Sequence, residues 1–410
     1  MNAAAPSSSS STRPQMPSRS PSQRSAARGA AADSRPTSAT PARDPPSSTP
    51  TPDPDRGETM MSIRTRSVLA AASAVTLLAA LTSCSASASG SGADGEPSFG
   101  DLALQLSFVK NAQNSGEYIA DSEGLYLDEG FSSVDLIAGP TAVEASVASG
   151  KADVGFSTAL TTANVIAAEG MPVKIIGSVY QLNAFTILSM DGPTAIRTPE
   201  DLEGARIGVT AGTAQTIVEA LANANGIDPD SIEFVPAEGN PALLTNGEVD
   251  GYFGLDTNER IVLEQQGEKV VSLPLAENGL PFAGTSFIVT EEALAEDRDR
   301  VKAFLLAEIK GWTQAVADPQ KGVDLALEEY GADLGLNPEK EAAQAEIQVG
   351  YVYPDSSIES GLFLLTPEAI ERNVEAISFA GVDIAAEDLF DMSLLEEIYA
   401  EHPELLKVTK

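Results

Sequence analysis

The sequence predicts an α/β fold with largely parallel, buried strands, and two observations carry this prediction. From Asp101 onward, short apolar runs of strand length alternate with helix-like segments rich in Ala and Leu. The chain has 410 residues and 42% hydrophobic content, which is enough to bury the cores of two domain-sized units. The strand-like runs in its first part span residues 102–108, 134–137, 154–156, 173–179 and 184–189.

The helices between these runs carry their own start and stop signals. We expect helices over residues 141–149 and 162–169. Thr141 and Glu144 have the spacing of a capping box, and Gly150 stands where a helix should end. Farther along, the pattern predicts a strand, a helix and a strand over residues 206–210, 213–225 and 232–235.

One short pattern occurs twice and indicates two α/β units of similar plan. GKADVGF at residues 150–156 is echoed by GEVDGYF at residues 247–253, and each copy follows a short helix rich in Ala and Leu. Chance similarity of one glycine, one aspartate and one phenylalanine is the alternative.

The N-terminal segment, residues 1–59, is a mixture of Ser, Pro, Ala and Arg with almost no large apolar side chains. Such a segment cannot bury enough surface to offset the entropy of ordering. We expect it to be disordered or to result from a mis-assigned start, because Met60 and Met61 open a secretory leader.

The leader, residues 60–83, has the features of a lipoprotein signal peptide. Arg64 and Arg66 precede an apolar stretch, residues 68–81, that is too short to span a bilayer. It runs into Leu-Thr-Ser-Cys at residues 81–84, which resembles a bacterial lipobox. That resemblance implies that Cys84 becomes the first mature residue and carries two acyl chains, which attach the chain to the membrane. A plain signal peptide with an accidental cysteine is the alternative. Residues 84–100 would form the anchor and a flexible tether.

Charge and composition exclude several classes of function. The chain has 25 basic and 60 acidic residues, and residues 1–83 contain 9 Arg and 5 acidic residues, so the remainder has a formal charge of −39. Such a surface argues against nucleic acid or anionic lipid as a partner. Cys84 is the one cysteine and His402 the one histidine. We therefore expect no internal disulfide, no Ser/His or Cys/His catalytic pair, no metal site and no cofactor.

Amide side chains crowd the end of the first apolar run, where Asn111, Gln113 and Asn114 follow Phe108. Amides offer both hydrogen-bond donors and acceptors, so they suit a ligand site at the end of a strand. The alternative is that Asn111 and Gln113 cap the following helix or close a turn.

Short landmarks then follow one another along the chain. They are Asn111-Ala-Gln113, Ser115-Gly-Glu-Tyr118, Gly124-Leu-Tyr126, Gly130-Phe131, Ala148-Ser-Gly-Lys-Ala-Asp153, Pro199-Glu-Asp-Leu202-Glu-Gly204, Thr257-Asn258-Glu259, Pro281-Phe282, Gly311-Trp312 and Asp318-Pro319. In this order they resemble the solute-binding lipoproteins of ABC importers, in the family that serves thiamine-precursor pyrimidines, riboflavin, nitrate, sulfonates and taurine.

The resemblance implies a two-lobed, periplasmic-binding-protein-like fold of type II, with a ligand cleft between lobes that two crossing segments join. Lobe I is expected to span residues 101–183 and 287–410, and lobe II residues 184–286, with crossings near Asn183 and Ser286. Ligands in such folds lie beyond the carboxyl ends of strands at the lobe interface. The amides after Phe108 would then line the cleft.

The resemblance also implies a flat heteroaromatic ligand, such as a thiamine-precursor pyrimidine, held by aromatic faces and a hydrogen-bonding edge. Glu259 is the sharpest candidate, because a carboxylate accepts from the N–H groups of an aminopyrimidine and disfavours an anion. Its alternative is an exposed glutamate at a helix start before Arg260. Phe253 and Trp312 are further candidate faces, although Trp312 lies on an apolar helical stripe that favours core packing. The expected ligand-binding residues are Asn111, Gln113, Tyr118, Thr158, Tyr180, Gln181, Thr213, Tyr252, Asn258, Glu259 and Phe282.

Departures from the family pattern leave the fold expectation intact and the ligand open. Phe108 stands where many relatives have tryptophan, Asn114 where many have histidine, and Glu117 where an aromatic is common. An anionic ligand, a sulfonate, taurine or nitrate, is the alternative. It would bind free N–H groups at the helix start beside Thr213, which could otherwise be an ordinary N-cap.

Together these observations predict a monomeric receptor, lipid-anchored to the outer face of the cytoplasmic membrane of a bacterium. It would capture a small solute and deliver it to an ABC permease and its ATPase. We expect no catalysis. A pyrimidine-precursor enzyme is a remote alternative, because a fungal relative of this fold makes the thiamine pyrimidine. A purely structural surface lipoprotein would leave the ordered landmarks unexplained.

Overall fold

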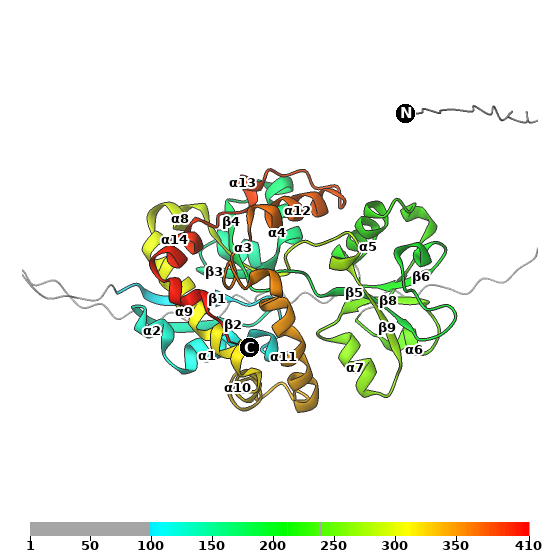
Figure 1. Cartoon of the computed structure of the whole chain (residues 1–410), viewed down its shortest axis with the longest axis horizontal. Helices are drawn as coiled ribbons and strands as arrows, with labels where there is room; N and C mark the ends of the chain where they lie inside the picture. The colour runs from blue at the N-terminus through cyan, green and yellow to red at the C-terminus, as the bar shows by residue number, and fades with distance from the viewer. Residues whose placement is uncertain (1–97, 211, 238, 410) are drawn as a thin grey trace, which may run out of the picture. The chain divides into compact units, whose positions relative to one another are not determined.

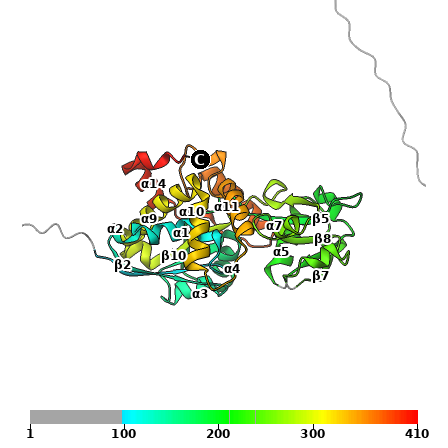
Figure 2. The same ribbon diagram turned by 90° about the horizontal axis from the view of Figure 1, so that it is seen from below.

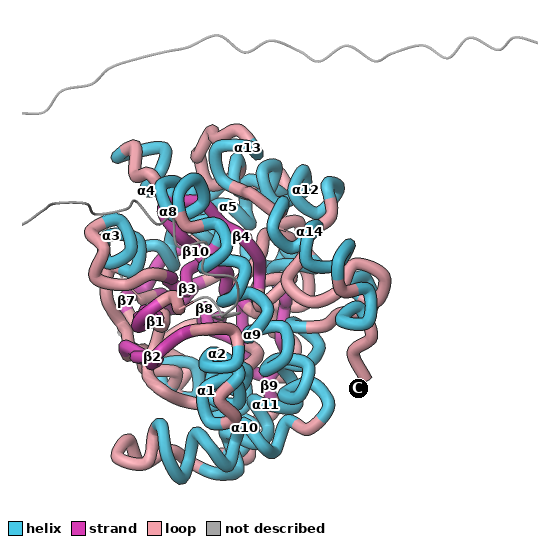
Figure 3. The backbone as a smooth tube through the Cα atoms, turned by 90° about the vertical axis from the view of Figure 1, so that its left-hand side faces the viewer, coloured by secondary structure: helices cyan, strands magenta, loops and turns pink. Residues whose placement is uncertain are grey.

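A computed structural model describes residues 98–409, except residues 211 and 238. The expected leader, Cys84 and most of the tether lie outside the described residues. The described chain forms two lobes, each built on one five-stranded sheet with helices around it (Figure 1). Strands lie inside and helices outside, as the view in Figure 3 shows. The α/β, two-lobed fold is therefore confirmed.

The sheet of lobe I has the strand order β2-β1-β3-β10-β4. β1 pairs in parallel with β2 and β3, whereas β10 lies antiparallel between β3 and β4. The strands span β1 Gly100–Gln105, β2 Phe131–Ile137, β3 Val154–Thr158, β4 Val173–Ser178 and β10 Thr285–Thr290.

The sheet of lobe II, of which β5, β7 and β8 are labelled in Figure 2, repeats this plan with the order β7-β6-β8-β5-β9. β6 pairs in parallel with β7 and β8, and β5 is antiparallel to both β8 and β9. The strands span β5 Phe185–Met190, β6 Arg206–Val209, β7 Glu233–Pro236, β8 Gly251–Leu255 and β9 Val270–Pro274.

The expectation of largely parallel strands needs one correction in each sheet. The reversed strands, β5 and β10, are those that enter a lobe directly after a crossing from the other lobe. A chain that crosses from the opposite lobe enters the sheet at the edge where the parallel strands end. It therefore runs antiparallel to them. Periodicity reports only whether a strand is buried, so it could not reveal this reversal.

The repeated Gly-x-x-Asp pattern has the same structural role in both lobes. Asp153 exchanges two hydrogen bonds with Ala103 of β1: its backbone N–H donates to the Ala103 carbonyl at 2.9 Å, and its Oδ2 accepts from the Ala103 N–H at 2.8 Å. Asp250 makes the same pair of bonds with Arg206 of β6, at 2.8 and 2.9 Å. Each aspartate thus joins the start of one parallel strand to its neighbour, and the repeat reflects two copies of one unit.

Helices pack around both sheets, and the longest of them, α9, crosses α1 closely (Figure 1). A Cβ on Gly116 of α1 would lie 2.2 Å from the Trp312 ring of α9, so only glycine permits this crossing. The helices span α1 Ser115–Ser122, α2 Leu125–Asp128, α3 Val143–Ala148, α4 Ala159–Glu169, α5 Thr213–Ala224, α6 Ala242–Thr245, α7 Glu259–Gln265, α8 Glu291–Glu296, α9 Arg298–Ala317, α10 Pro319–Leu325, α11 Pro338–Val352, α12 Pro367–Ser378, α13 Ala386–Leu389 and α14 Ser393–Glu401.

The capping box predicted from Thr141 and Glu144 does not form. α3 is capped by Ala142 without a side-chain hydrogen bond, and the Glu144 carboxylate is buried, where it accepts from the hydroxyls of Ser157 and Thr162. Burial of the carboxylate beside two hydroxyl donors outweighs the local capping preference, which spacing alone cannot foresee.

Candidate ligand-binding site

A cavity of about 260 Å³, the inner pocket, lies between the two lobes. β1, β3 and β8 end at it, so it sits beyond the carboxyl ends of parallel strands from both sheets. Its lining residues are Ser107, Phe108, Asn111, Gln113, Thr158, Tyr180, Asn183, Ala184, Phe185, Leu255, Thr257, Asn258, Glu259, Gly284, Thr285 and Gln344.

The two crossing segments form one side of this pocket and run side by side. They connect β4 to β5 through residues 179–184 and β9 to β10 through residues 275–284. The Asn183 side chain donates to the carbonyls of Leu280 and Phe282 at 2.8 and 3.1 Å and accepts from the Phe185 N–H at 3.2 Å. A Cβ on Gly284 would lie 2.9 Å from the Cβ of Tyr180, so the close approach of the segments requires glycine there.

Asn111 caps a turn and also lines the inner pocket. Its Oδ1 accepts from the Gln113 N–H at 3.0 Å and caps the 3₁₀ turn Ala112–Asn114. Its amide nitrogen donates to no described residue, and the side chain lines the inner pocket. The Gln113 amide nitrogen makes only long contacts, of 3.4 Å, to the hydroxyls of Ser107 and Thr285. Both amides can therefore serve a ligand without breaking strong internal bonds.

Aromatic rings supply the apolar walls. Phe108 is 46% exposed, which is unusual for a large apolar side chain and places its ring in the space between the lobes. Phe185 stacks on Phe253 with ring centroids 5.1 Å apart. The Tyr180 hydroxyl donates to Gln348 Oε1 at 3.0 Å, and burial raises its pKa far above the usual range. Tyr180 therefore offers a ring face and no free hydroxyl.

Glu259 is the one charged side chain among the described residues that line the inner pocket. It begins α7, where its Oε2 accepts from the Leu255 N–H at 2.8 Å and its Oε1 from the Asn258 amide at 2.9 Å. These bonds hold the carboxylate in place, and each oxygen can accept one further bond. A fixed carboxylate among rings and amides suits a neutral or cationic ligand with N–H donors and disfavours an anion.

The structure brings six of the eleven predicted residues to the inner pocket: Asn111, Gln113, Thr158, Tyr180, Asn258 and Glu259. The other five lie outside its lining. Tyr118 is buried against Tyr330, Gln181 donates to the Ser178 carbonyl behind the crossing, and Tyr252 lies in the apolar core of lobe II. Burial and the charge of Glu259 raise the pKa of Tyr252 to about 12. Phe282 packs behind Phe185 and is 1% exposed.

Thr213 is the first residue of α5, and Gly212 is the N-cap without a side-chain hydrogen bond. The ordinary N-capping considered for Thr213 is thus wrong, and the helix start lies outside the lining of the inner pocket.

Sequence reasoning missed Phe185, Asn183 and Gln344 as lining residues. Gln344 belongs to α11, far along the chain, and is 2% exposed. Its only sequence signal is a pair of glutamines four residues apart, Gln344 and Gln348, on a helix that buries both. Trp312 is buried and donates to Glu117 at 3.0 Å, so its core role is as expected.

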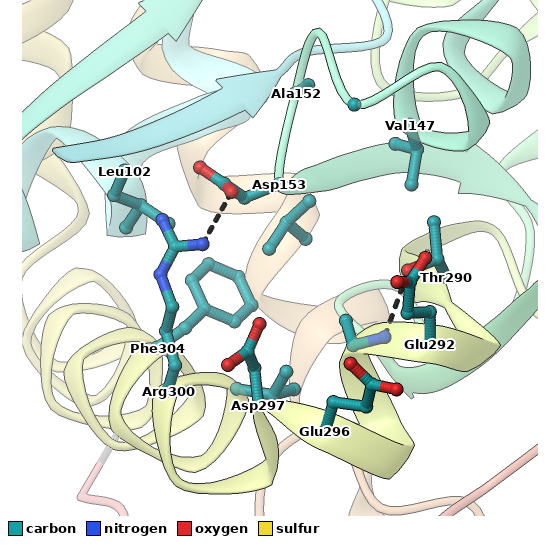
Figure 4. A pocket seen from close by; sticks show the side chains of 14 residues that line it. Leu102, Val147, Ala152, Asp153, Thr290, Glu292, Glu296, Asp297, Arg300 and Phe304 are labelled. Atoms are coloured by element: carbon teal, nitrogen blue, oxygen red, sulfur yellow. Dashed lines mark hydrogen bonds and ion pairs between the residues drawn. The ribbon is translucent and has the colours of Figure 1, made fainter. Parts of the chain in front are cut away.

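A second hollow, of about 200 Å³, lies on lobe I beside α8 and α9 (Figure 4). Arg300 reaches across it and donates to Asp153 Oδ1 and to the Asp101 carbonyl, each at 2.6 Å. Its cation is therefore already paired, and the remaining charged groups, Glu292, Glu296 and Asp297, are all acidic. The Arg300 bonds in this hollow support the junction of β1 and β3 at Asp153. The hollow offers no convergent donors for a ligand.

Two features that would indicate other functions are absent from the described residues. No group of three or more His, Cys, Asp or Glu side chains within residues 98–409 is placed to hold a metal ion. Over the same described part of the chain, no helix has the length and apolar character needed to cross a membrane.

This fold defines a structural class, the two-lobed periplasmic-binding-protein fold. The periplasmic aliphatic sulphonate-binding protein of Escherichia coli has this fold, with a TM-score of 0.54 at 14% identity, over 75% of this chain and 89% of that protein. Within the class, the chain belongs to the NMT1/THI5-like family, whose model matches residues 111–322.

Its relatives carry two kinds of name. A riboflavin-binding protein of Chloroflexus aurantiacus is 25% identical over 239 residues, which cover 57% of this chain and 67% of the relative. A 4-amino-5-hydroxymethyl-2-methylpyrimidine phosphate synthase of Schizosaccharomyces pombe is 27% identical over 216 residues, which cover 49% of this chain and 62% of the relative. The relatives thus include a protein named for binding and a protein named as an enzyme.

Proposed function

We propose that this protein is the extracytoplasmic receptor of an ABC import system, and that it binds a small heteroaromatic solute with N–H donors in the inner pocket. One observation carries the proposal: the rings of Phe108, Tyr180 and Phe185 and the fixed carboxylate of Glu259 converge on one interlobe cavity. The solute that we propose is a thiamine-precursor aminopyrimidine or a similar heteroaromatic compound.

Capture would work by closure of the lobes. Asn111 and Gln113 come from lobe I, whereas Phe185, Asn258 and Glu259 come from lobe II. A ligand that contacts both sets stabilises the state in which they are close together, so binding favours closure about the crossing segments. The closed form would then deliver the solute to the permease and its ATPase.

The names of the relatives support a nitrogen heterocycle. One is named for riboflavin and several for a pyrimidine, and both compounds are flat rings with hydrogen-bonding edges. An anionic ligand has less support, because Thr213 lies away from the inner pocket and the one charged lining residue is acidic. The synthase names favour catalysis as a second candidate, and the experiment below separates it from binding.

The first test is a thermal-shift panel on the purified chain with aminopyrimidines, thiamine, riboflavin, taurine, alkanesulfonates and nitrate. A ligand at 100 times its Kd stabilises the native state by about 2.7 kcal/mol and raises the midpoint by several degrees. Any ligand that shifts the midpoint is incubated with the protein and recovered, and its mass is then measured by mass spectrometry. An unchanged mass supports a receptor, and a converted compound supports an enzyme. A shift with sulfonates or nitrate alone would refute the heteroaromatic assignment.

The role of Glu259 can be tested by calorimetry with Glu259→Gln. Glutamine keeps an oxygen for the Leu255 N–H, so the start of α7 is preserved, but the charge is removed. Hydrogen bonds to charged groups contribute about 1.5–3 kcal/mol, so aminopyrimidine affinity should fall roughly 10- to 100-fold. Glu264→Gln, an exposed acidic residue of the same helix, is the matched control. Equal affinities for the two variants would remove Glu259 from the site.

A further inference from the structure

A groove of about 450 Å³, the outer groove, continues from the inner pocket between α7 of lobe II and the N-terminal turn of α11 of lobe I. α7 and α11 lie next to each other in both Figure 1 and Figure 2. Phe108, Asn111 and Asn258 line both spaces, so the two are neighbouring parts of one interlobe cleft. The outer groove adds Val109, Val262, Gln265, Leu336, Lys340 and Glu341 to the lining.

Lys340 is an unusual side chain for such a place, because only 10% of it is exposed. Its ammonium contacts the Gln344 side-chain oxygen and lies 3.3 Å from Glu341 Oε1. An ammonium has three donors, and these two partners leave one for a group in the groove. Gln344 lines the inner pocket, so Lys340 stands beside both spaces.

The charge of Lys340 is already balanced. Glu341 is 2% exposed, and its Oε2 accepts from the Ala112 N–H at 2.8 Å, so the carboxylate is fixed beside the ammonium. A dianionic group such as a phosphate would have to approach this carboxylate. An uncharged oxygen meets no such repulsion and can accept the free donor. Apolar walls at Val109 and Val262 with the Gln265 amide nearby suit a carbon chain that carries hydroxyls.

We propose that the outer groove is a second subsite of the cleft, which takes an uncharged, hydroxyl-bearing chain attached to the ring in the inner pocket, with Lys340 and Gln265 as its specificity residues. The inference deepens the proposed function and rests on it. Ligand pockets usually have about 300–1,000 Å³. The inner pocket alone, at about 260 Å³, lies below this range, and the groove supplies the further room for a chain.

The test compares riboflavin with lumiflavin, which has the same ring and a methyl group in place of the hydroxylated chain. FMN, whose chain ends in a phosphate, and 4-amino-5-hydroxymethyl-2-methylpyrimidine complete the set of probes. Affinities are measured by calorimetry on the full chain and on three variants. Lys340→Met and Gln265→Ala alter the groove, and Lys269→Met removes an exposed lysine elsewhere. Melting temperatures without ligand show whether each variant folds. Gln265 is exposed, so Gln265→Ala keeps the test valid if Lys340→Met does not fold.

We expect riboflavin to bind at least about tenfold more tightly than lumiflavin, and Lys340→Met and Gln265→Ala to abolish most of that ratio without weakening lumiflavin. Lys269→Met should leave the ratio unchanged. Equal binding of the two flavins, tighter binding of FMN than riboflavin, or binding of the pyrimidine alone would overturn the subsite while leaving the proposed function standing. If none of the four probes binds, the proposed function itself fails.

Discussion

Two buried glutamates make the stability of this protein depend on pH, and Glu117→Gln should weaken that dependence. Glu117 of α1 and Glu308 of α9 are 1% and 0% exposed. Glu117 Oε1 accepts from the Trp312 N–H at 3.0 Å, and Glu308 Oε1 accepts from the Tyr126 hydroxyl. The two carboxyls hydrogen-bond each other, and the second oxygen of each has no further partner among the described residues. No buried cation compensates either charge within these contacts, so ionisation in place is costly.

The magnitude follows from the pKa values. Burial, the main cause, raises the pKa of Glu117 from 4.5 to about 7, and burial together with the charge of Glu117 raises the pKa of Glu308 well above its usual range. The native state therefore binds protons that the unfolded chain has released. This contribution to stability is fully present below about pH 4.5 and is lost as pH rises through about 7. For Glu117 the loss is about 3 kcal/mol.

The assay is urea denaturation followed by circular dichroism at pH 5, 6.5 and 8. Glutamine keeps an acceptor for Trp312 and has no charge to desolvate, so Glu117→Gln should gain about 2–3 kcal/mol relative to the wild type between pH 5 and pH 8. Glu346→Gln, at an exposed position of α11, controls for the general repulsion of an acidic surface. A difference between Glu117→Gln and wild type that stays constant from pH 5 to pH 8 would refute the reasoning.

Three other predictions concern packing, the crossing segments and the anchor. Gly116→Ala places a Cβ against Trp312 and should cost about 1–3 kcal/mol in urea denaturation, whereas Gly192→Ala, with open space around the new Cβ, should cost far less. Asn183→Ala removes the side-chain donor to the Leu280 carbonyl and the acceptor for the Phe185 N–H, and it should destabilise by about 1–3 kcal/mol in the same assay; an unchanged midpoint would contradict its structural role. Cys84→Ser should abolish labelling by radioactive palmitate and move the protein from the membrane to the soluble fraction, and retained label would refute lipidation at this residue.

Some features of the fold were readable because they are local. The repeated Gly-x-x-Asp pattern predicted two similar units, and Asp153 and Asp250 indeed make equivalent bonds to neighbouring strands. Gly150 ends the α3 turn with a φ of 70°, as its place in the pattern predicted. These residues shape or bond the backbone within a few residues or on the adjacent strand. A short sequence pattern is therefore enough to predict their role.

The candidate site was only partly readable. Asn111 and Gln113 were identifiable as lining residues because they follow a strand, and Glu259 because it belongs to the Thr257-Asn258-Glu259 landmark of the family resemblance. Tyr118 and Tyr252 carry the right chemistry but point into cores, since the face on which a side chain lies depends on how its element packs. No local pattern distinguishes a tyrosine that faces a core from one that faces a cleft.

By itself the sequence determined the α/β alternation, the two repeated units and the acidic character of the chain, because periodicity and composition record which side chains are buried. Only the tertiary structure decided that β5 and β10 run antiparallel to their neighbours, and that Phe185 of lobe II and Gln344 of α11 line the same pocket as Asn111. The physical reason is that strand order and lobe contact arise from burial between segments distant in the chain. Such contacts leave no recognisable pattern among residues that are neighbours in the sequence.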